Sequence, residues 1–236
     1  MHEADTGSWL IDSPAYSDWY KNSGRFFWLY GIAGSGKTIL FSTLIEDIKR
    51  RIESDAKGYV GFGYFYFDFQ DTTKRSTNYL IRTLIRQLCS GDSISWTTIT
   101  TLYESCSRSG QQPSQHVLLD LLVEVVDETD QTFIMIDALD ECIDKEDALN
   151  TTLELFERVS GNLNILITSR HETFVEDSLC DVDTQRSAKV AVRNAAVDKD
   201  ISNFVKARME KDRKLRKWKA ESNHIVESLV SQADGM

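Results

Sequence analysis

The sequence is poor in proline and contains no long apolar run. Of its 236 residues only Pro14 and Pro113 are prolines, which excludes a proline-rich scaffold or a disordered linker protein. No segment approaches the ~20 consecutive apolar residues that a membrane-spanning helix needs. Residues 1–12 also lack the basic and then apolar pattern of a secretory signal peptide. We therefore expect a cytoplasmic protein without a membrane partner.

Cysteine and histidine are equally scarce, with four residues of each type, and neither type is clustered. The cysteines are Cys89, Cys106, Cys142 and Cys180, and no pair of them has the spacing of a zinc finger or a redox motif. Structural zinc requires clustered ligands, so we expect no zinc site. Scattered cysteines of this kind are typical of reduced thiols in an intracellular protein.

The charge is acidic and unevenly distributed. The formal net charge of −10 argues against a broadly basic surface, so we expect no nucleic-acid partner. Residues 206–219 depart from this balance with eight basic and two acidic residues, so the rest of the chain carries a charge of −16. This segment is either a solvated helix end or a docking surface for an acidic partner or another domain.

Five short apolar runs recur along the chain, and helical patterns lie between them. Runs that are apolar on both faces are typical of parallel strands that helices cover on both sides. The runs occupy residues 26–30, 63–67, 132–136, 164–168 and 189–192. One helical pattern follows the first run, two lie between the second and third, and one fills each later interval. The sequence therefore predicts an α/β protein with a doubly wound, five-stranded parallel sheet.

Helical patterns also lie outside the predicted sheet. A short helix is expected to begin at Pro14, since proline is favoured at the first helical position. After the last strand, two apolar stripes with helical spacing follow one another. We therefore place a boundary near Asn194, with a nucleotide-binding domain at 1–194 and a partial helical subdomain at 195–236.

Residues 31–38 read Gly-Ile-Ala-Gly-Ser-Gly-Lys-Thr and match the phosphate-loop pattern G-x-x-x-x-G-K-[ST]. The motif lies between the predicted strand 26–30 and a predicted helix at 39–51, as its mechanism requires. Backbone N–H groups of the glycine-rich turn and the positive end of the helix can hold phosphate oxygens there. The residues expected to bind nucleotide are Gly31, Ala33, Gly34, Ser35, Gly36, Lys37, Thr38 and Ile39.

Three side chains are expected to serve the phosphates and their metal ion. We expect Lys37 to reach the β- and γ-phosphates and to act in catalysis, and the Thr38 hydroxyl to ligate Mg²⁺. Asp137 ends the strand predicted at 132–136. An acid at the carboxyl end of a parallel strand beside the phosphate loop is placed to hold Mg²⁺ through water. The alternative for Asp137 is an acid that caps the strand.

Three further charged residues are candidates for catalysis. Asp140 and Glu141 lie one turn after Asp137, where a carboxylate can orient or deprotonate an attacking water. Which of the two acts on water and which supports it stays open. Arg170 follows the apolar segment 163–169, where it is placed to approach the γ-phosphate. The alternative for Arg170 is an exposed arginine that pairs with a surface acid.

With these motifs the chain resembles the nucleotide-binding core of NACHT-type STAND NTPases, in particular the nephrocystin-like N-terminal module of fungal NOD-like receptor proteins. The segments that carry the resemblance are residues 28–38, 64–69, 134–142 and 165–170. The resemblance implies a strand order of 5-1-4-3-2, with Arg170 beside the phosphate loop, followed by a truncated helical subdomain. It also implies ATP, ADP and Mg²⁺ as ligands, slow ATP hydrolysis as a conformational switch, and self-association or other protein partners on activation.

Two other functions are compatible with the same motifs. A P-loop phosphotransferase that acts on a small molecule would carry an arginine-rich lid, for which Arg75, Arg82 and Arg86 are candidates. The acidic pair at 140–141 instead favours water as the acceptor. A scaffold that binds nucleotide without hydrolysing it is the third possibility, and the choice between ATP and GTP stays open.

Overall fold

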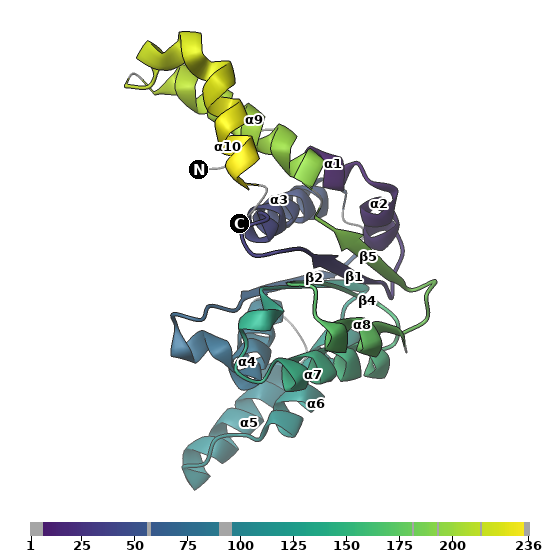
Figure 1. Ribbon diagram of the computed structural model, residues 1–236. Helices are drawn as coiled ribbons and strands as arrows, with labels where there is room; N and C mark the ends of the chain where they lie inside the picture. The colour runs from purple at the N-terminus through teal and green to yellow at the C-terminus, as the bar shows by residue number, and fades with distance from the viewer. Residues whose placement is uncertain are drawn as a thin grey trace.

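The chain folds around one parallel β-sheet with helices on both of its faces (Figure 1). The computed structural model describes residues 7–55, 58–89, 96–180, 182–192, 194–212 and 214–233. The strands are β1 (Phe26–Tyr30), β2 (Val60–Tyr66), β3 (Gln131–Asp137), β4 (Leu163–Ser169) and β5 (Ser187–Ala191). They lie in the order β2-β3-β4-β1-β5, and all neighbours are parallel. The predicted α/β class and the order 5-1-4-3-2 are confirmed.

Successive side chains of a strand point to opposite faces of the sheet, so the core is divided into two layers. Phe27 and Leu29 face the layer of the first three helices, whereas Phe26 and Trp28 face the other layer. The first layer contains α1 (Ser8–Ile11), α2 (Pro14–Lys21) and α3 (Lys37–Asp55). The second contains α4 (Thr77–Leu88), α5 (Trp96–Ser109), α6 (Gln115–Asp127), α7 (Lys145–Arg158) and α8 (Thr173–Cys180). The 3-10 turns η1 (Thr72–Arg75) and η2 (Leu139–Glu141) connect elements of this second layer to β2 and β3.

The described part of the interval between β2 and β3 contains three α-helices, so the prediction of two was wrong. The missed helix is α5, whose first turns are rich in threonine, a β-branched residue with low helix propensity. The hydroxyls of Thr100 and Thr101 donate to the carbonyls of Trp96 and Thr97 at 2.8 and 2.9 Å. These bonds satisfy the hydroxyls within the helix, a local solution that apolar periodicity does not reveal.

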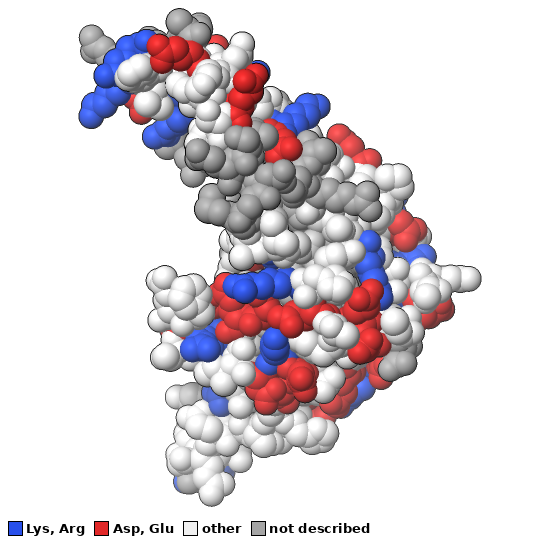
Figure 2. All heavy atoms as spheres, viewed as in Figure 1, with Lys and Arg blue, Asp and Glu red and all other residues white. Residues whose placement is uncertain are grey.

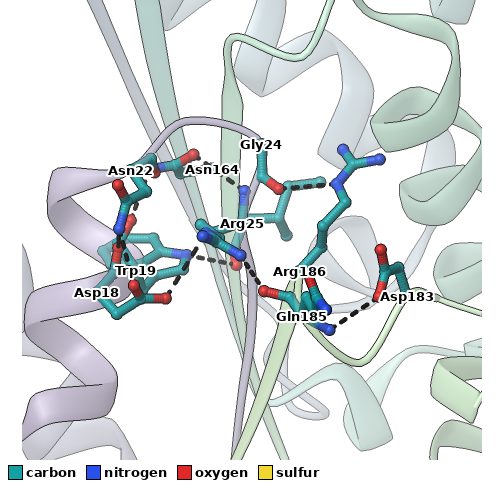
Figure 3. Close-up of polar contacts among 10 residues, drawn as sticks. Asp18, Trp19, Asn22, Gly24, Arg25, Asn164, Asp183, Gln185 and Arg186 are labelled. Carbon is teal, nitrogen blue, oxygen red and sulfur yellow. Dashed lines mark hydrogen bonds and ion pairs between the residues drawn. The ribbon is translucent and has the colours of Figure 1, made fainter.

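A polar anchor joins α2 to the amino ends of β1, β4 and β5 (Figure 3). At its centre Asn164 is fully buried and makes three hydrogen bonds. Its Nδ2 donates to the carbonyls of Trp19 and Asn22 at 2.7 and 2.8 Å, and its Oδ1 accepts from the Arg25 N–H at 3.2 Å. The indole of Trp19 in turn donates to the carbonyl of Ile165 at 2.9 Å. These bonds fix the position of α2 relative to the start of β1.

Replacing Asn164 with alanine is expected to lower the free energy of unfolding by about 3 kcal/mol, since one buried and two partly buried backbone groups lose their partner. For a chain of this size the melting temperature should fall by roughly 6–12 °C. The matched control is Asn22→Ala, because within the described residues the exposed side chain of Asn22 bonds only to Asp18. Urea unfolding of both variants measures the difference, and equal midpoints would contradict the importance of the buried amide.

The chain after β5 forms a helical tail of α9 (Asn194–Lys211), η3 (Arg216–Glu221) and α10 (Ser222–Ala233). The tail projects from the sheet (Figure 1) and buries Met209 and Val226. It is tied back at its base, where the N–H of Gly7 before α1 donates to Asp200 Oδ2 at 3.0 Å. Basic side chains gather at its far end, whereas acidic side chains form a band across the sheet-bearing part (Figure 2). In the described part of the chain, no helix has the length and apolar character that crossing a bilayer requires.

Candidate functional site

A cavity of about 300 Å³ lies where the phosphate loop meets the carboxyl ends of β3 and β4. Most of the residues that the sequence singled out line it together: Ala33, Gly34, Ser35, Gly36, Lys37, Thr38, Ile39, Asp140, Glu141 and Arg170. Ala138 and Thr168 also line it. Gly31 and Asp137 do not. Gly31 packs against the side chains of Ser35 and Val192, and the carboxylate of Asp137 is engaged by the hydroxyls of Thr38 and Thr168.

The glycines of the loop serve two different structural needs. Gly34 and Gly36 have φ angles of +77° and +85°, a left-handed conformation that glycine adopts without a steric penalty. Gly31 instead permits close packing, because a Cβ atom there would lie 2.7 Å from the Ser35 Oγ. At Gly36 a Cβ atom would enter open space, so only the backbone conformation restricts that position.

The loop presents a set of unused hydrogen-bond donors. Within the described residues, no acceptor bonds to the backbone N–H groups of Gly34, Gly36, Lys37, Thr38 or Ile39. They lie at the start of α3, where the helix dipole adds partial positive charge. The buried Ser35 Oγ also has no hydrogen-bond partner in the part of the chain that the structure describes. Such a concentration of donors suits an anion with several oxygens, as a phosphate chain is.

The Lys37 ammonium folds back onto the loop. Its Nζ donates to the carbonyls of Gly31 and Ile32 at 2.8 and 2.7 Å. Burial lowers the pKa of Lys37, and the nearby carboxylates of Asp140 and Asp137 oppose that shift. A bound phosphate would offer the ammonium a charged acceptor in place of two neutral carbonyls, which makes a stronger hydrogen bond.

Asp137 and Thr38 form the part of the site that suits a divalent cation. The Thr38 Oγ1 donates to Asp137 Oδ2 at 2.8 Å, which joins the start of α3 to the end of β3. Asp137 is only 2% exposed. Burial raises the pKa of its carboxyl, and hydrogen bonds from Thr168 and Thr38 oppose that shift.

This donor set fits Mg²⁺, which binds oxygen ligands and usually takes only one or two carboxylates beside water and phosphate oxygens. Among the residues that the structure describes, no group of three or more His, Cys, Asp and Glu side chains is arranged to hold a metal ion. The chain could therefore contribute Thr38 and Asp137, while phosphate oxygens and water would complete the coordination.

The two acids after β3 have different partners. Both oxygens of Asp140 contact Arg170: Oδ1 accepts a hydrogen bond from the Arg170 backbone N–H at 3.1 Å, and Oδ2 forms an ion pair with its Nε, also at 3.1 Å. Glu141 Oε2 accepts from the backbone N–H of Phe69 at 3.0 Å. The Arg170 side chain remains 59% exposed and borders the cavity, so it combines an ion pair with access to a ligand.

Sequence reasoning assigned no role to Thr168 or Ala138. Thr168 is fully buried, and its hydroxyl bonds to Asp137 Oδ1 at 2.5 Å. Ala138 has a φ angle of +55° and a ψ angle of +48°, and it is the one non-glycine residue with positive φ in the described part of the chain. That conformation costs an alanine ~1–2 kcal/mol. The available signal for Thr168 was a hydroxyl at the polar carboxyl end of a strand that is buried along its whole length; Ala138 had none.

Comparisons with known proteins identify the family of this chain. The family described as Nephrocystin 3, N-terminal, matches residues 5–170. Vegetative incompatibility protein HET-E-1 of Podospora anserina is 24% identical over 243 residues, which cover 98% of this chain and 17% of that protein. This chain therefore spans about a sixth of the length of that relative.

Two solved structures share the fold. The Aeropyrum pernix ORC1 protein, solved in complex with DNA, superposes with a TM-score of 0.55 at 13% identity, over 79% of this chain and 44% of that chain. The Aeropyrum pernix ORC2 protein in its ADP form has a TM-score of 0.54 at 12% identity, over 88% of this chain and 52% of that chain. At such low identity the likeness shows the fold alone.

Proposed function

This chain belongs to the Nephrocystin 3, N-terminal family of nucleotide-binding NTPase domains, and from that premise we propose that it binds ATP and ADP with Mg²⁺ and hydrolyses ATP slowly. The observation that carries the proposal is the convergence of unused N–H donors, Lys37 and the Thr38–Asp137 pair at one cavity of about 300 Å³. Each of these groups suits a different part of a magnesium-bound triphosphate.

In the proposed reaction the loop N–H groups bind the phosphate oxygens, and Lys37 leaves its carbonyl partners to bind the β- and γ-phosphates. Thr38 and Asp137 would hold Mg²⁺, which when bound neutralises phosphate charge. Arg170 would contact the γ-phosphate. These contacts place the terminal phosphorus in a fixed position for attack by water.

We assign the orientation of that water to Glu141 rather than Asp140. Both oxygens of Asp140 already bind Arg170, so Asp140 is suited to hold the arginine in place. Glu141 uses one oxygen to bind Phe69, and no hydrogen bond to its other oxygen exists within the described residues. A carboxylate with an unused oxygen at the cavity can accept a proton from water.

The positions of the arginines disfavour a phosphotransferase. Arg82 and Arg86 lie on α4 and line a separate groove between α4, α5 and α6, rather than the cavity at the phosphate loop. In the described part of the chain, Arg170 is the one arginine that lines that cavity. The lid that a small-molecule kinase would need is therefore not supported by these side chains.

We further propose that the identity of the bound nucleotide, ATP or ADP, controls association with partners. We also propose that the protein is cytoplasmic, with a nucleotide-binding domain at 1–194 and a partial helical subdomain at 195–236. The support is the family and the relative HET-E-1, which is named as a vegetative incompatibility protein. The basic far end of the tail remains a candidate docking surface for an acidic partner (Figure 2).

The proposal is tested by identifying the nucleotide that copurifies with the chain and by titrating the emptied protein with ATP, ADP and GTP. We expect one nucleotide per chain and an affinity for ATP that increases with Mg²⁺. Failure to bind any of the three would refute the proposal. Binding without phosphate release in a single-turnover assay would instead indicate a non-hydrolysing module, and release that depends on an added acceptor would indicate a phosphotransferase.

A further inference from the structure

Thr168 occupies the point where the carboxyl ends of three strands meet. It lies on β4, between β3 on one side and β1 on the other, and it is fully buried. Because Ile136 on β3 pairs with Ile167 on β4, the next residues of the two strands, Asp137 and Thr168, lie side by side.

The hydroxyl of Thr168 makes two hydrogen bonds, both to the end of β3. It donates its proton to Asp137 Oδ1 at 2.5 Å and accepts the backbone N–H of Ala138 at 2.9 Å. One hydroxyl thus binds the side chain of one residue and the backbone of the next. Serine offers the same donor and acceptor, whereas valine has the same shape and offers neither.

The first bond fixes the orientation of the Asp137 carboxylate. With Oδ1 held by Thr168, the other oxygen, Oδ2, is the one that meets the Thr38 hydroxyl at 2.8 Å. A carboxylate that is held on one side keeps its second oxygen at a defined place, which is how supporting hydrogen bonds orient metal ligands.

The second bond holds the chain where it leaves the strand. Ala138 has a left-handed conformation that is unfavourable for alanine, so its surroundings must maintain it. The residues that follow form η2, which brings Asp140 and Glu141 to the cavity. The same hydroxyl therefore supports both the carboxylate suited to the cation and the turn that carries the acids.

We propose that Thr168 is a positioning residue that orients Asp137 toward Mg²⁺ and holds the turn at Ala138, so that the gain in ATP affinity on adding Mg²⁺ depends on its hydroxyl. The inference rests on the proposed function, because it concerns the same nucleotide site. Thr168 acts through Asp137 and Ala138, and its own contact with a ligand is not required.

The test compares ATP affinity with Mg²⁺ and with EDTA in the full chain. In Thr168→Val the affinity in EDTA should stay within about twofold of the original chain, because the loop donors are unchanged. The gain on adding Mg²⁺ should fall by about tenfold or more, as expected when the partner of a metal ligand is removed. Thr168→Ser should restore most of that gain.

Thr152→Val is the matched control for the loss of a buried threonine hydroxyl. Thr152 lies on α7, and its Oγ1 donates to the carbonyl of Ala148 at 2.7 Å. In the Thr152→Val variant, the gain in ATP affinity on adding Mg²⁺ should equal that of the original chain. If Thr168→Val does not fold, as circular dichroism would show, Thr168→Cys replaces it. A thiol is a weaker donor, so part of the gain should be lost.

Three results would overturn the inference. The first is that Thr168→Val, or its cysteine substitute, keeps the full gain in ATP affinity on adding Mg²⁺. The second is that Thr168→Ser loses as much of this gain as Thr168→Val does, and the third is that Thr168→Val lowers ATP affinity equally with Mg²⁺ and with EDTA. The last result would mean that Thr168 supports the cavity as a whole. Failure of the original chain to bind ATP at all would instead contradict the proposed function, so the two failures are distinguishable.

Discussion

Replacing Lys37 with alanine is expected to weaken ATP binding by about 100-fold. A hydrogen bond from a charged group to phosphate contributes roughly 1.5–3 kcal/mol, and 1.4 kcal/mol corresponds to a tenfold change in affinity. Arg170, the other cation among the described residues that line the cavity, is already paired with Asp140, so it cannot fully compensate. Isothermal titration with Mg·ATP measures the loss directly.

Lys49→Ala is the matched control for this experiment. Lys49 lies on the same helix as Lys37, about three turns further on. Its ammonium is 3.8 Å from a Glu46 oxygen and lies over the ring of Tyr64, and it does not line the cavity. Its removal should leave ATP affinity unchanged. Undiminished binding by Lys37→Ala would disprove the role of the loop lysine.

Glu141→Gln is expected to slow ATP hydrolysis by roughly 100- to 1,000-fold while ATP affinity stays within about twofold, since general base catalysis contributes factors of this size. Glutamine keeps a carbonyl oxygen that can accept the Phe69 N–H, so the contact between η2 and the loop after β2 can persist. What disappears is the charged oxygen that would accept a proton from water.

Single-turnover phosphate release from preloaded ATP measures this change without interference from product dissociation. Asp140→Asn provides the comparison, because it removes the charge that binds Arg170 rather than the assigned base. We expect a smaller decrease in hydrolysis for that variant. Equal rates in the original chain and in Glu141→Gln would refute the assignment, and a larger loss in Asp140→Asn would exchange the roles of the two acids.

The phosphate loop could be predicted from the sequence because its requirements are local. Gly34 and Gly36 have the backbone conformations that a glycine permits, and Lys37 and Thr38 begin the helix as the motif demands. The five strands could be predicted because each is an apolar run between helical patterns. The order of the strands required the resemblance to a family, because periodicity carries no information about which strands become neighbours.

What could not be predicted depends on contacts between distant segments. Thr168 bonds to Asp137 across 31 residues of chain, and the conformation of Ala138 depends on that same hydroxyl. In both cases the deciding interaction lies outside the window in which a pattern is recognised.

Helix α5 was missed for a different, local reason. Its threonines have low helix propensity, and their hydroxyls are satisfied by carbonyls one turn earlier in the same helix.

The anchor at Asn164 has a consequence for how the chain tolerates change. Asn164 and Thr168 point to the same face of β4, yet they are four residues apart, about 13 Å along the strand. Changes that are this far apart and share no partner usually have additive energies. The losses of stability caused by substitutions at Asn164 and at Thr168 should therefore add in the double variant, so the two ends of β4 can be altered independently.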